Sequence, residues 1–356
     1  MKDVIIVGRG LAASILMHAF SDAGIGFTCI GLPSLSNSSH VAAGIWNPVV
    51  FKRLTKSWMA ETLVQELDLF YARCEKRLGA KLVSSRKLMK PFTEEQEKVL
   101  WLKKATNELD AFLDRTIHDA DVVEHRSCLI PNQYGCVKQA GNLNMEAFLS
   151  GTEAFFKSFI VNETFDHSRL QLNESGVEYN GLKARRIVFC EGYRVKDNPL
   201  FNWIPLKPAK GEVLTIVCED LGLQNSILNR NGFIMDLGNN LYKVGATYAW
   251  DDNSELPTEK AKLELEQKIK QLITCPYHLV KHEAGIRPSS ADRRPIVGAH
   301  PLHPQVFVLN GLGTKGVMLG PFVANNFVHF ILENKALLPE MDVKRFYHLY
   351  ETSRNA

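Results

Sequence analysis

The sequence predicts a mixed α/β fold, and three observations support this prediction. Residues 4–7 form a continuous aliphatic run that passes through a glycine turn directly into an apolar helix. Residues 306–319 show the same order of buried strand, glycine-rich turn and helix near the other end of the chain. Between these units, residues 206–217 and 232–248 have strand patterns and a hairpin signal at Gly238-Asn239-Asn240, which indicates a separate antiparallel sheet.

The composition is that of an ordinary globular protein with two domains. At 356 residues the chain is long for one core and short for three. Its 42 basic and 39 acidic residues leave a formal charge of +3, which argues against a nucleic-acid partner but keeps that alternative open. The seven cysteines are scattered without C-x-x-C spacing, so we expect reduced thiols, a cytoplasmic location and no metal. With neither a secretory signal nor a bilayer-length apolar run, we expect no membrane association.

The first glycine turn has the pattern Gly8-x-Gly10-x-x-Ala13. Gly8 permits a tight turn, Gly10 has no Cβ to keep a pyrophosphate away, and Ala13 is small enough for close packing of helix on strand. The N–H groups at the start of the helix would then face an anion. We interpret the stretch as a nucleotide-binding unit; the alternative is an ordinary strand-to-helix turn without a ligand.

The second strand lacks a residue that dinucleotide-binding folds usually have. After a helix over residues 11–23, we expect a strand over residues 27–30, where an Asp or Glu commonly holds a ribose hydroxyl. The positions read Ile30, Gly31, Leu32 and Pro33 instead. The hydroxyl-rich residues 34–40 could supply a ribose or anion contact, or could form a capped surface loop.

The rest of the chain alternates helical and extended patterns. Apolar spacing predicts exposed amphipathic helices over residues 56–77 and 94–112, and further helices over 145–159 and 257–273. Residues 131–141 are rich in turn formers. Short strands fill residues 161–192 and end at Gly192, and a last buried strand over 306–310 precedes a helix that extends to residue 332.

Taken together, these motifs resemble the FAD-dependent D-amino-acid oxidase superfamily, especially its glycine oxidase and sarcosine oxidase-like members. The resemblance rests on the N-terminal motif, on Gly192 and on segments that lie in the right order along the chain: Ala42-Ala43-Gly44, Gly285-Ile286-Arg287-Pro288 and residues 311–319. It covers nearly the whole chain, although residues 71–148 carry little signature. The C-terminal turn is also similar to the oxidase half of bifunctional wobble-uridine tRNA-modifying enzymes.

The resemblance implies a Rossmann-like FAD-binding domain assembled from discontinuous segments, with an inserted antiparallel-sheet substrate domain. We assign residues 1–80, 149–205 and 285–356 to the first domain, and residues 81–148 and 206–284 to the second.

The resemblance also implies the contacts of the cofactor. The N-terminal turn would hold the FAD diphosphate, and the C-terminal turn would surround the carbonyl edge of the flavin. Residues 282–288 contain no cysteine, so we expect non-covalent FAD. The residues expected to contact FAD are Gly8, Gly10, Leu11, Ala12, Ala13, Ser38, Ser39, Ala42, Ala43, Gly44, Trp46, Gly192, Gly311, Gly313, Thr314, Lys315, Gly316 and Val317.

Arg287 is the expected substrate-binding residue, because its counterpart in the family pairs with the substrate carboxylate. The alternative is a structural arginine paired with Asp292. Phe233 stands where the family often has Tyr, so a second substrate contact would come from Tyr248, or from Lys207 or Lys210.

Lys315 would place a positive charge near the reduced flavin, or would be an ordinary exposed loop lysine. The catalytic candidates are Arg287, Lys315 and Tyr248.

The expected activity is oxidation of the C–N bond of a small amine or amino acid by hydride transfer to flavin N5, with O2 as acceptor. One alternative is oxidation of a modified wobble uridine in tRNA. Another is a degenerate flavin-binding protein, suggested by the missing ribose acid and by Phe233. The sequence leaves the substrate's identity and stereochemistry, the final acceptor and the oligomeric state open.

Overall fold

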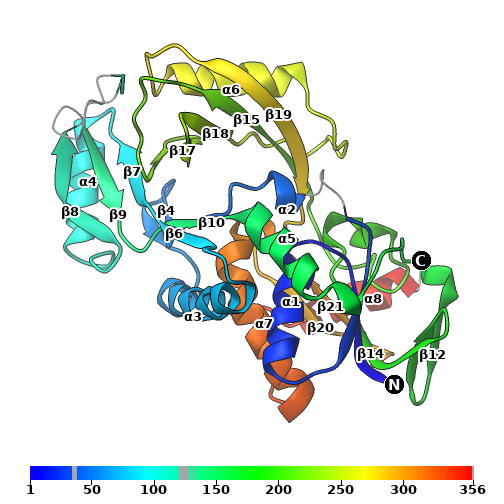
Figure 1. Cartoon of the computed structure of the whole chain (residues 1–356). Helices are drawn as coiled ribbons and strands as arrows, with labels where there is room; N and C mark the ends of the chain where they lie inside the picture. Colours follow the sequence, from blue (N-terminus) through cyan, green and yellow to red (C-terminus); the bar gives the residue numbers. More distant parts are fainter. Residues whose placement is uncertain (34–37, 120–127, 131–132, 355–356) are drawn as a thin grey trace.

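The structure is a computed structural model, and it describes residues 1–33, 38–119, 128–130 and 133–354. Figure 1 shows two large sheets with helices packed around them. The predicted mixed α/β fold is confirmed by these sheets and helices.

The first large sheet has a parallel core drawn from three distant parts of the chain. β1 lies between β2 and β14 with parallel pairing on both sides; β11 extends the sheet beyond β2, and β21 pairs parallel with β14. β12, β13 and β20 add antiparallel pairs. The strands are β1 (Lys2–Val7), β2 (Phe27–Ile30), β11 (Ile160–Val161), β12 (Leu170–Asn173), β13 (Gly176–Tyr179), β14 (Leu182–Phe189), β20 (Ile296–Ala299) and β21 (Val306–Asn310).

Four helices bury the main hydrophobic core against this sheet. α1 and α7 pack on each other, and α3 and α5 pack beside them (Figure 1). Their apolar faces join the inner faces of β1 and β2 in one cluster that includes Leu16, Phe20, Phe148 and Phe327. These helices are α1 (Leu11–Asp22), α3 (Ala60–Leu78), α5 (Met145–Phe155) and α7 (Gly316–Glu333).

The second large sheet is mostly antiparallel, and two helices pack against it. α6 (Glu259–Lys270) packs on one face in a separate apolar cluster with Leu214, Ile234 and Val244. α4 (Glu95–Ala105) packs against the far end of the sheet, at β8. The strands, in sheet order, are β19 (His278–Arg287), β15 (Ala209–Val217), β18 (Leu241–Gly245), β17 (Phe233–Gly238), β16 (Ser226–Asn229), β7 (Lys87–Pro91), β9 (Gln133–Val137) and β8 (Leu113–Asp119).

Short elements complete the described part of the chain. They are α2 (Ser38–Val41), α8 (Tyr347–Arg354), β3 (Ile45–Trp46), β4 (Val49–Val50), β5 (Thr55–Lys56), β6 (Val83–Ser85), β10 (Gly141–Leu143), and the 3-10 turns η2 (Lys157–Phe159), η3 (His167–Arg169), η4 (Gly192–Asp197), η5 (Gly313–Lys315) and η6 (Val343–Phe346).

Several predicted boundaries are wrong for reasons of tertiary packing. The helix predicted from residue 56 begins at Ala60, because Thr55–Lys56 pairs with β4. The helix predicted over residues 94–112 ends at Ala105, and the turns that follow bury Leu109 and Phe112. The segment 131–141, expected to be turns, contains β9. The bounds of the two proposed domains stay a prediction.

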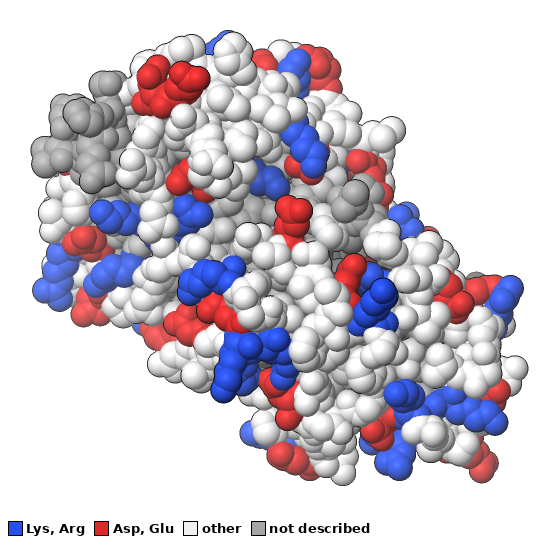
Figure 2. Space-filling model, in the orientation of Figure 1, with Lys and Arg blue, Asp and Glu red and all other residues white. Residues whose placement is uncertain are grey.

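The visible surface carries no large area of a single charge. Figure 2 shows Lys and Arg side chains interspersed with Asp and Glu over the face in view. Within the described ranges, no helix combines the length and apolar character needed to cross a bilayer.

Candidate functional site

A single cavity of about 940 Å³ lies at the carboxyl ends of the parallel strands and extends to the second sheet. Such a volume is at the upper end for ligand sites. Its walls come from the β1–α1 turn, the start of α7, residues 190–194 and one face of β15, β18 and β19. The two sheets therefore contribute to one site.

The N-terminal turn has the close approaches that its glycines were expected to allow. Gly8 has a φ of +121°, and a Cβ there would lie 2.4 Å from the carbonyl oxygen of Cys190. Gly10 is the N-cap of α1 and has no side chain to cap the helix; the N–H of Leu11 donates to Ser39 Oγ at 3.0 Å. This helix start lines the cavity, so its positive end faces the space where an anion would bind.

Arg9 explains why the second strand has no acid. Its side chain lies against Gly31, where a Cβ would meet Arg9 Cγ at 2.5 Å. The Arg9 guanidinium donates to the Gly31 carbonyl oxygen at 3.1 Å and to Asn162 Oδ1 at 2.7 Å, and forms an ion pair with Glu153 at 2.7 Å. A side chain at residue 31 would therefore require Arg9 to move from this position.

The C-terminal turn places Lys315 in the lining of the cavity. Lys315 is not an exposed loop lysine, since burial, with a smaller contribution from nearby Arg294, lowers the pKa of its ammonium to about 8. Its Nζ donates to Ser57 Oγ. Ser57 comes from a distant segment, so no local sequence pattern could have identified this contact.

Most of the sequence-predicted residues share this cavity. Three of the predicted FAD contacts lie outside the lining: Ala13 is a buried residue of α1, Trp46 packs in the core and donates from Nε1 to the Gln139 carbonyl oxygen, and Gly311 packs against Ile296. Residues 34–37 of the serine loop lie outside the described residues. The predicted residues that line the cavity are Gly8, Gly10, Leu11, Ala12, Ser38, Ser39, Ala42, Ala43, Gly44, Gly192, Gly313, Thr314, Lys315, Gly316, Val317, Tyr248 and Arg287.

Arg287 is a partly buried cation that lines the cavity and has no carboxylate partner in the described part of the chain. Its Nη1 donates to the carbonyl oxygens of Thr247 at 3.2 Å and Lys210 at 3.4 Å. The expected alternative partner, Asp292, instead pairs with Arg345 at 2.9 Å. Burial lowers the pKa of Arg287, so an anion in the cavity would stabilise its charge.

The surroundings of Arg287 separate the candidates for a second substrate contact. Tyr248 lines the cavity, and its ring lies over the guanidinium with 4.4 Å between Arg287 Cζ and the ring centroid. Lys207 is exposed outside the cavity, and Lys210 is fully buried with its ammonium occupied by protein groups. Neither lysine therefore contacts a ligand at Arg287.

Sequence reasoning missed a polar extension of the cavity. Beyond Phe233, the lining continues to Asn229, Asn231 and Lys268. Lys268 lies on α6 and donates to the carbonyl oxygen of Ala246 at 3.1 Å. Asn229 ends β16, Asn231 lies in the following turn and Lys268 lies on α6, and none of these segments has a recognisable motif.

Comparison with known proteins identifies the family of the chain. The family model described as FAD dependent oxidoreductase matches residues 3–328. The chain is 25% identical over 199 residues to the tRNA 5-methylaminomethyl-2-thiouridine biosynthesis bifunctional protein MnmC of Legionella pneumophila, a match covering 48% of this chain and 30% of that protein. It is 27% identical over 158 residues to glycine oxidase of Bacillus licheniformis, covering 43% of this chain and 42% of the relative. The matched segments therefore span less than half of either curated relative.

A solved structure extends the likeness to the whole fold. Glycine oxidase from Geobacillus kaustophilus superposes with a TM-score of 0.78 over 97% of both chains at 18% identity. This degree of similarity establishes a shared architecture.

The cavity fits FAD, the cofactor of this family. A dinucleotide needs close backbone approach, and Gly8 and Gly10 provide it at the positive end of α1. Gly313, Lys315 and Gly316 would hold the flavin end, because backbone N–H groups and an ammonium there can interact with its carbonyl edge.

Proposed function

The chain belongs to the FAD dependent oxidoreductase family, and on that premise we propose that it oxidises the C–N bond of a small amine or amino acid carrying a carboxylate. The observation that carries this proposal is Arg287, a partly buried guanidinium in the cavity without an acidic partner in the described ranges. A planar guanidinium fork binds a carboxylate in two parallel hydrogen bonds. Nη1 is held by two backbone carbonyls, which leaves Nη2 and Nε to face a ligand.

The residues around Arg287 would orient the substrate. Bound FAD supplies the acceptor for the hydride that leaves the carbon next to the amine. Arg287 anchors the carboxylate, while the Tyr248 ring shields that ion pair from water on one side. Phe233 lines the cavity nearby and limits the space around the substrate. The imine product hydrolyses in water, and O2 accepts the electrons.

The decisive experiment is a spectrum of the purified protein, with added FAD, followed by anaerobic mixing with glycine, sarcosine, proline, D-amino acids and iminodiacids. Bleaching of the flavin band by one of these compounds would support amine oxidation and would identify the substrate class. If none of them reduces the flavin, the proposal fails and the degenerate flavin-binding alternative gains support. Flavin that stays with the acid-precipitated pellet would contradict non-covalent binding.

A second candidate function is oxidation of a modified wobble uridine. Similarity to MnmC over 48% of this chain favours it, and the polar extension at Asn229, Asn231 and Lys268 offers space for a substrate larger than an amino acid. The mixed surface charge in Figure 2 gives it no support. A gel shift with bulk tRNA, repeated across salt concentrations, tests it: no binding at low salt would discard the idea.

A further inference from the structure

We propose that Lys210 is a positioning residue whose buried ammonium fixes residues 247–258, and with them Tyr248, over Arg287. This inference rests on the proposed function, because it takes Arg287 as the carboxylate-binding group. Lys210 itself never reaches the ligand.

The alternation of β15 places Lys210 behind the site. Gly211 and Val213 line the cavity, so Lys210 and Glu212 face the opposite side of the sheet, toward α6. Lys210 is fully buried, with 0% of its surface exposed. A buried ammonium is retained only where polar groups compensate for its lost hydration.

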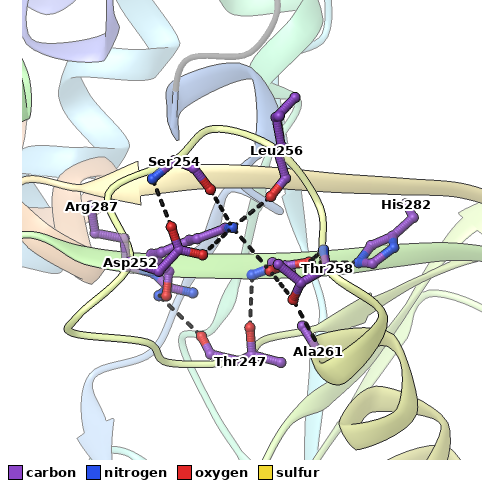
Figure 3. Close-up of polar contacts among 10 residues, drawn as sticks. Thr247, Asp252, Ser254, Leu256, Thr258, Ala261, His282 and Arg287 are labelled. Carbon is purple, nitrogen blue, oxygen red and sulfur yellow. Dashed lines mark hydrogen bonds and ion pairs between the residues drawn. The ribbon is translucent and has the colours of Figure 1, made fainter.

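Three of those compensating groups come from one segment of the chain. Lys210 Nζ donates to Asp252 Oδ2 at 2.6 Å, to Ser254 Oγ at 3.0 Å and to the carbonyl oxygen of Leu256 at 2.5 Å. Figure 3 shows Asp252, Ser254 and Leu256 converging on one ammonium from the same loop. Ser254 and Leu256 are exposed, so apolar packing contributes little to holding this segment.

The backbone of Lys210 connects the same segment to Arg287. Its N–H donates to the Ala249 carbonyl oxygen at 2.8 Å, and the N–H of Ala249 donates back to the Lys210 carbonyl oxygen at 3.0 Å. The same carbonyl oxygen accepts from Arg287 Nη1 at 3.4 Å. Tyr248 lies between Thr247 and Ala249, so the position of its ring follows the position of this short paired stretch.

Glu212 fixes the far end of the segment. This buried carboxylate accepts from the N–H of Thr258 at 2.7 Å and from its hydroxyl at 2.9 Å, at the N-terminus of α6. It also lies 3.4 Å from Lys210 Nζ and 2.8 Å from His282 Nε2. A further contact, from the Tyr193 hydroxyl to Glu255 at 2.7 Å, ties the middle of the segment to the other side of the cavity.

These contacts fix the distance between the Tyr248 ring and the Arg287 guanidinium. With 4.4 Å between the guanidinium carbon and the ring centroid, the ring excludes water from one side of the cation. If the segment moved outward, Arg287 would become hydrated and would bind an anion less tightly. Lys210 therefore acts on ligand affinity through Tyr248.

The test compares wild-type holoenzyme with Lys210→Met, with sodium glycolate as the carboxylate probe and the flavin spectrum as the signal. We expect the glycolate Kd to rise about tenfold or more, and amide exchange across residues 249–256 to accelerate by a similar factor. FAD affinity should stay unchanged. In a Tyr248→Ala background, Lys210→Met should cause no further loss of glycolate affinity. Lys260→Met, an exposed lysine on α6, is the matched control and should match wild type.

The outcomes separate the two proposals. Unchanged exchange and unchanged glycolate affinity in Lys210→Met would overturn the positioning role, as would full additivity with Tyr248→Ala. If wild-type holoenzyme does not bind glycolate, the proposed carboxylate function fails, while the exchange measurement still decides the role of Lys210. If Lys210→Met does not fold, Asp252→Ala and Ser254→Ala each remove one contact and carry the same test.

Discussion

Replacement of Gly211 by Ala tests the Arg287 site without removing the arginine. A Cβ at residue 211 would lie 2.0 Å from Arg287 Nη2 and 2.2 Å from Cζ. Ordinary van der Waals contact begins at 3.4 Å, so the guanidinium would have to move by about 1.4 Å (3.4 − 2.0). The Arg287 side chain is flexible and can move sideways, although the Tyr248 ring covers its other side. We therefore expect the guanidinium to shift within the cavity while the fold persists.

A displacement of this size should be costly for a bidentate contact. In catalysis, a misplacement of about 1 Å can lower the rate roughly a hundredfold. We take this factor as the upper limit for the loss of affinity. We expect the glycolate Kd of the Gly211→Ala holoenzyme to rise between about tenfold and a hundredfold, equivalent to roughly 1.4–2.8 kcal/mol. FAD affinity should not change, because Gly211 lies on the second sheet and the diphosphate-binding turn on the first.

The assay is a titration of holoenzyme with sodium glycolate, followed by flavin absorption, beside a fluorescence titration of apoprotein with FAD. Gly151→Ala is the matched control: this glycine lies inside α5, and its new methyl would meet only the flexible Leu78 side chain at 3.1 Å or more. Wild-type glycolate affinity in Gly211→Ala would refute the assignment of Arg287 as the anion-binding group.

Three further predictions follow from the same geometry. Arg287→Met should lose glycolate binding by about 3 kcal/mol, since one side of a buried charged pair is removed; an unchanged Kd in the absorption titration would exclude Arg287 from the site. Gly8→Ala should lower FAD affinity and the free energy of unfolding, the latter by about 2 kcal/mol or more. The φ of +121° at residue 8 is strained for alanine, and the new Cβ would lie 2.4 Å from the Cys190 carbonyl oxygen. FAD titration and thermal unfolding measure the two effects, and wild-type values would contradict the prediction. Burial lowers the pKa of Lys315 from 10.5 to about 8, so folded apoprotein binds fewer protons than unfolded chain between these values. The unfolding free energy of the apoprotein should therefore rise by about 3 kcal/mol through Lys315 as pH rises from about 8 to about 10.5. In urea unfolding curves, Lys315→Met should abolish that rise.

The sequence alone determined the elements whose signals are local. The aliphatic run of β1, the turn at Gly8 and the start of α1 follow one another within a few residues, so backbone sterics and apolar periodicity identify them together. The same holds for β21 and α7. The resemblance that these motifs carry is confirmed by the family match over residues 3–328. β7 and β19 were not predicted, because they pair with strands far away in the chain. β8 was not predicted either, although its partner β9 follows soon after it.

Only the tertiary structure decided the roles of individual charged residues. The sequence identified Lys315 by its glycine-rich turn, but it left open whether Lys315 and Lys210 reach the site, and it assigned no role to Arg9. In the fold, Arg9 packs against Gly31, the ammonium of Lys210 is buried and bound by protein groups, and Lys315 lines the cavity. Burial and the identity of the nearest opposite charge set the behaviour of such groups, and both depend on segments brought together from distant parts of the chain.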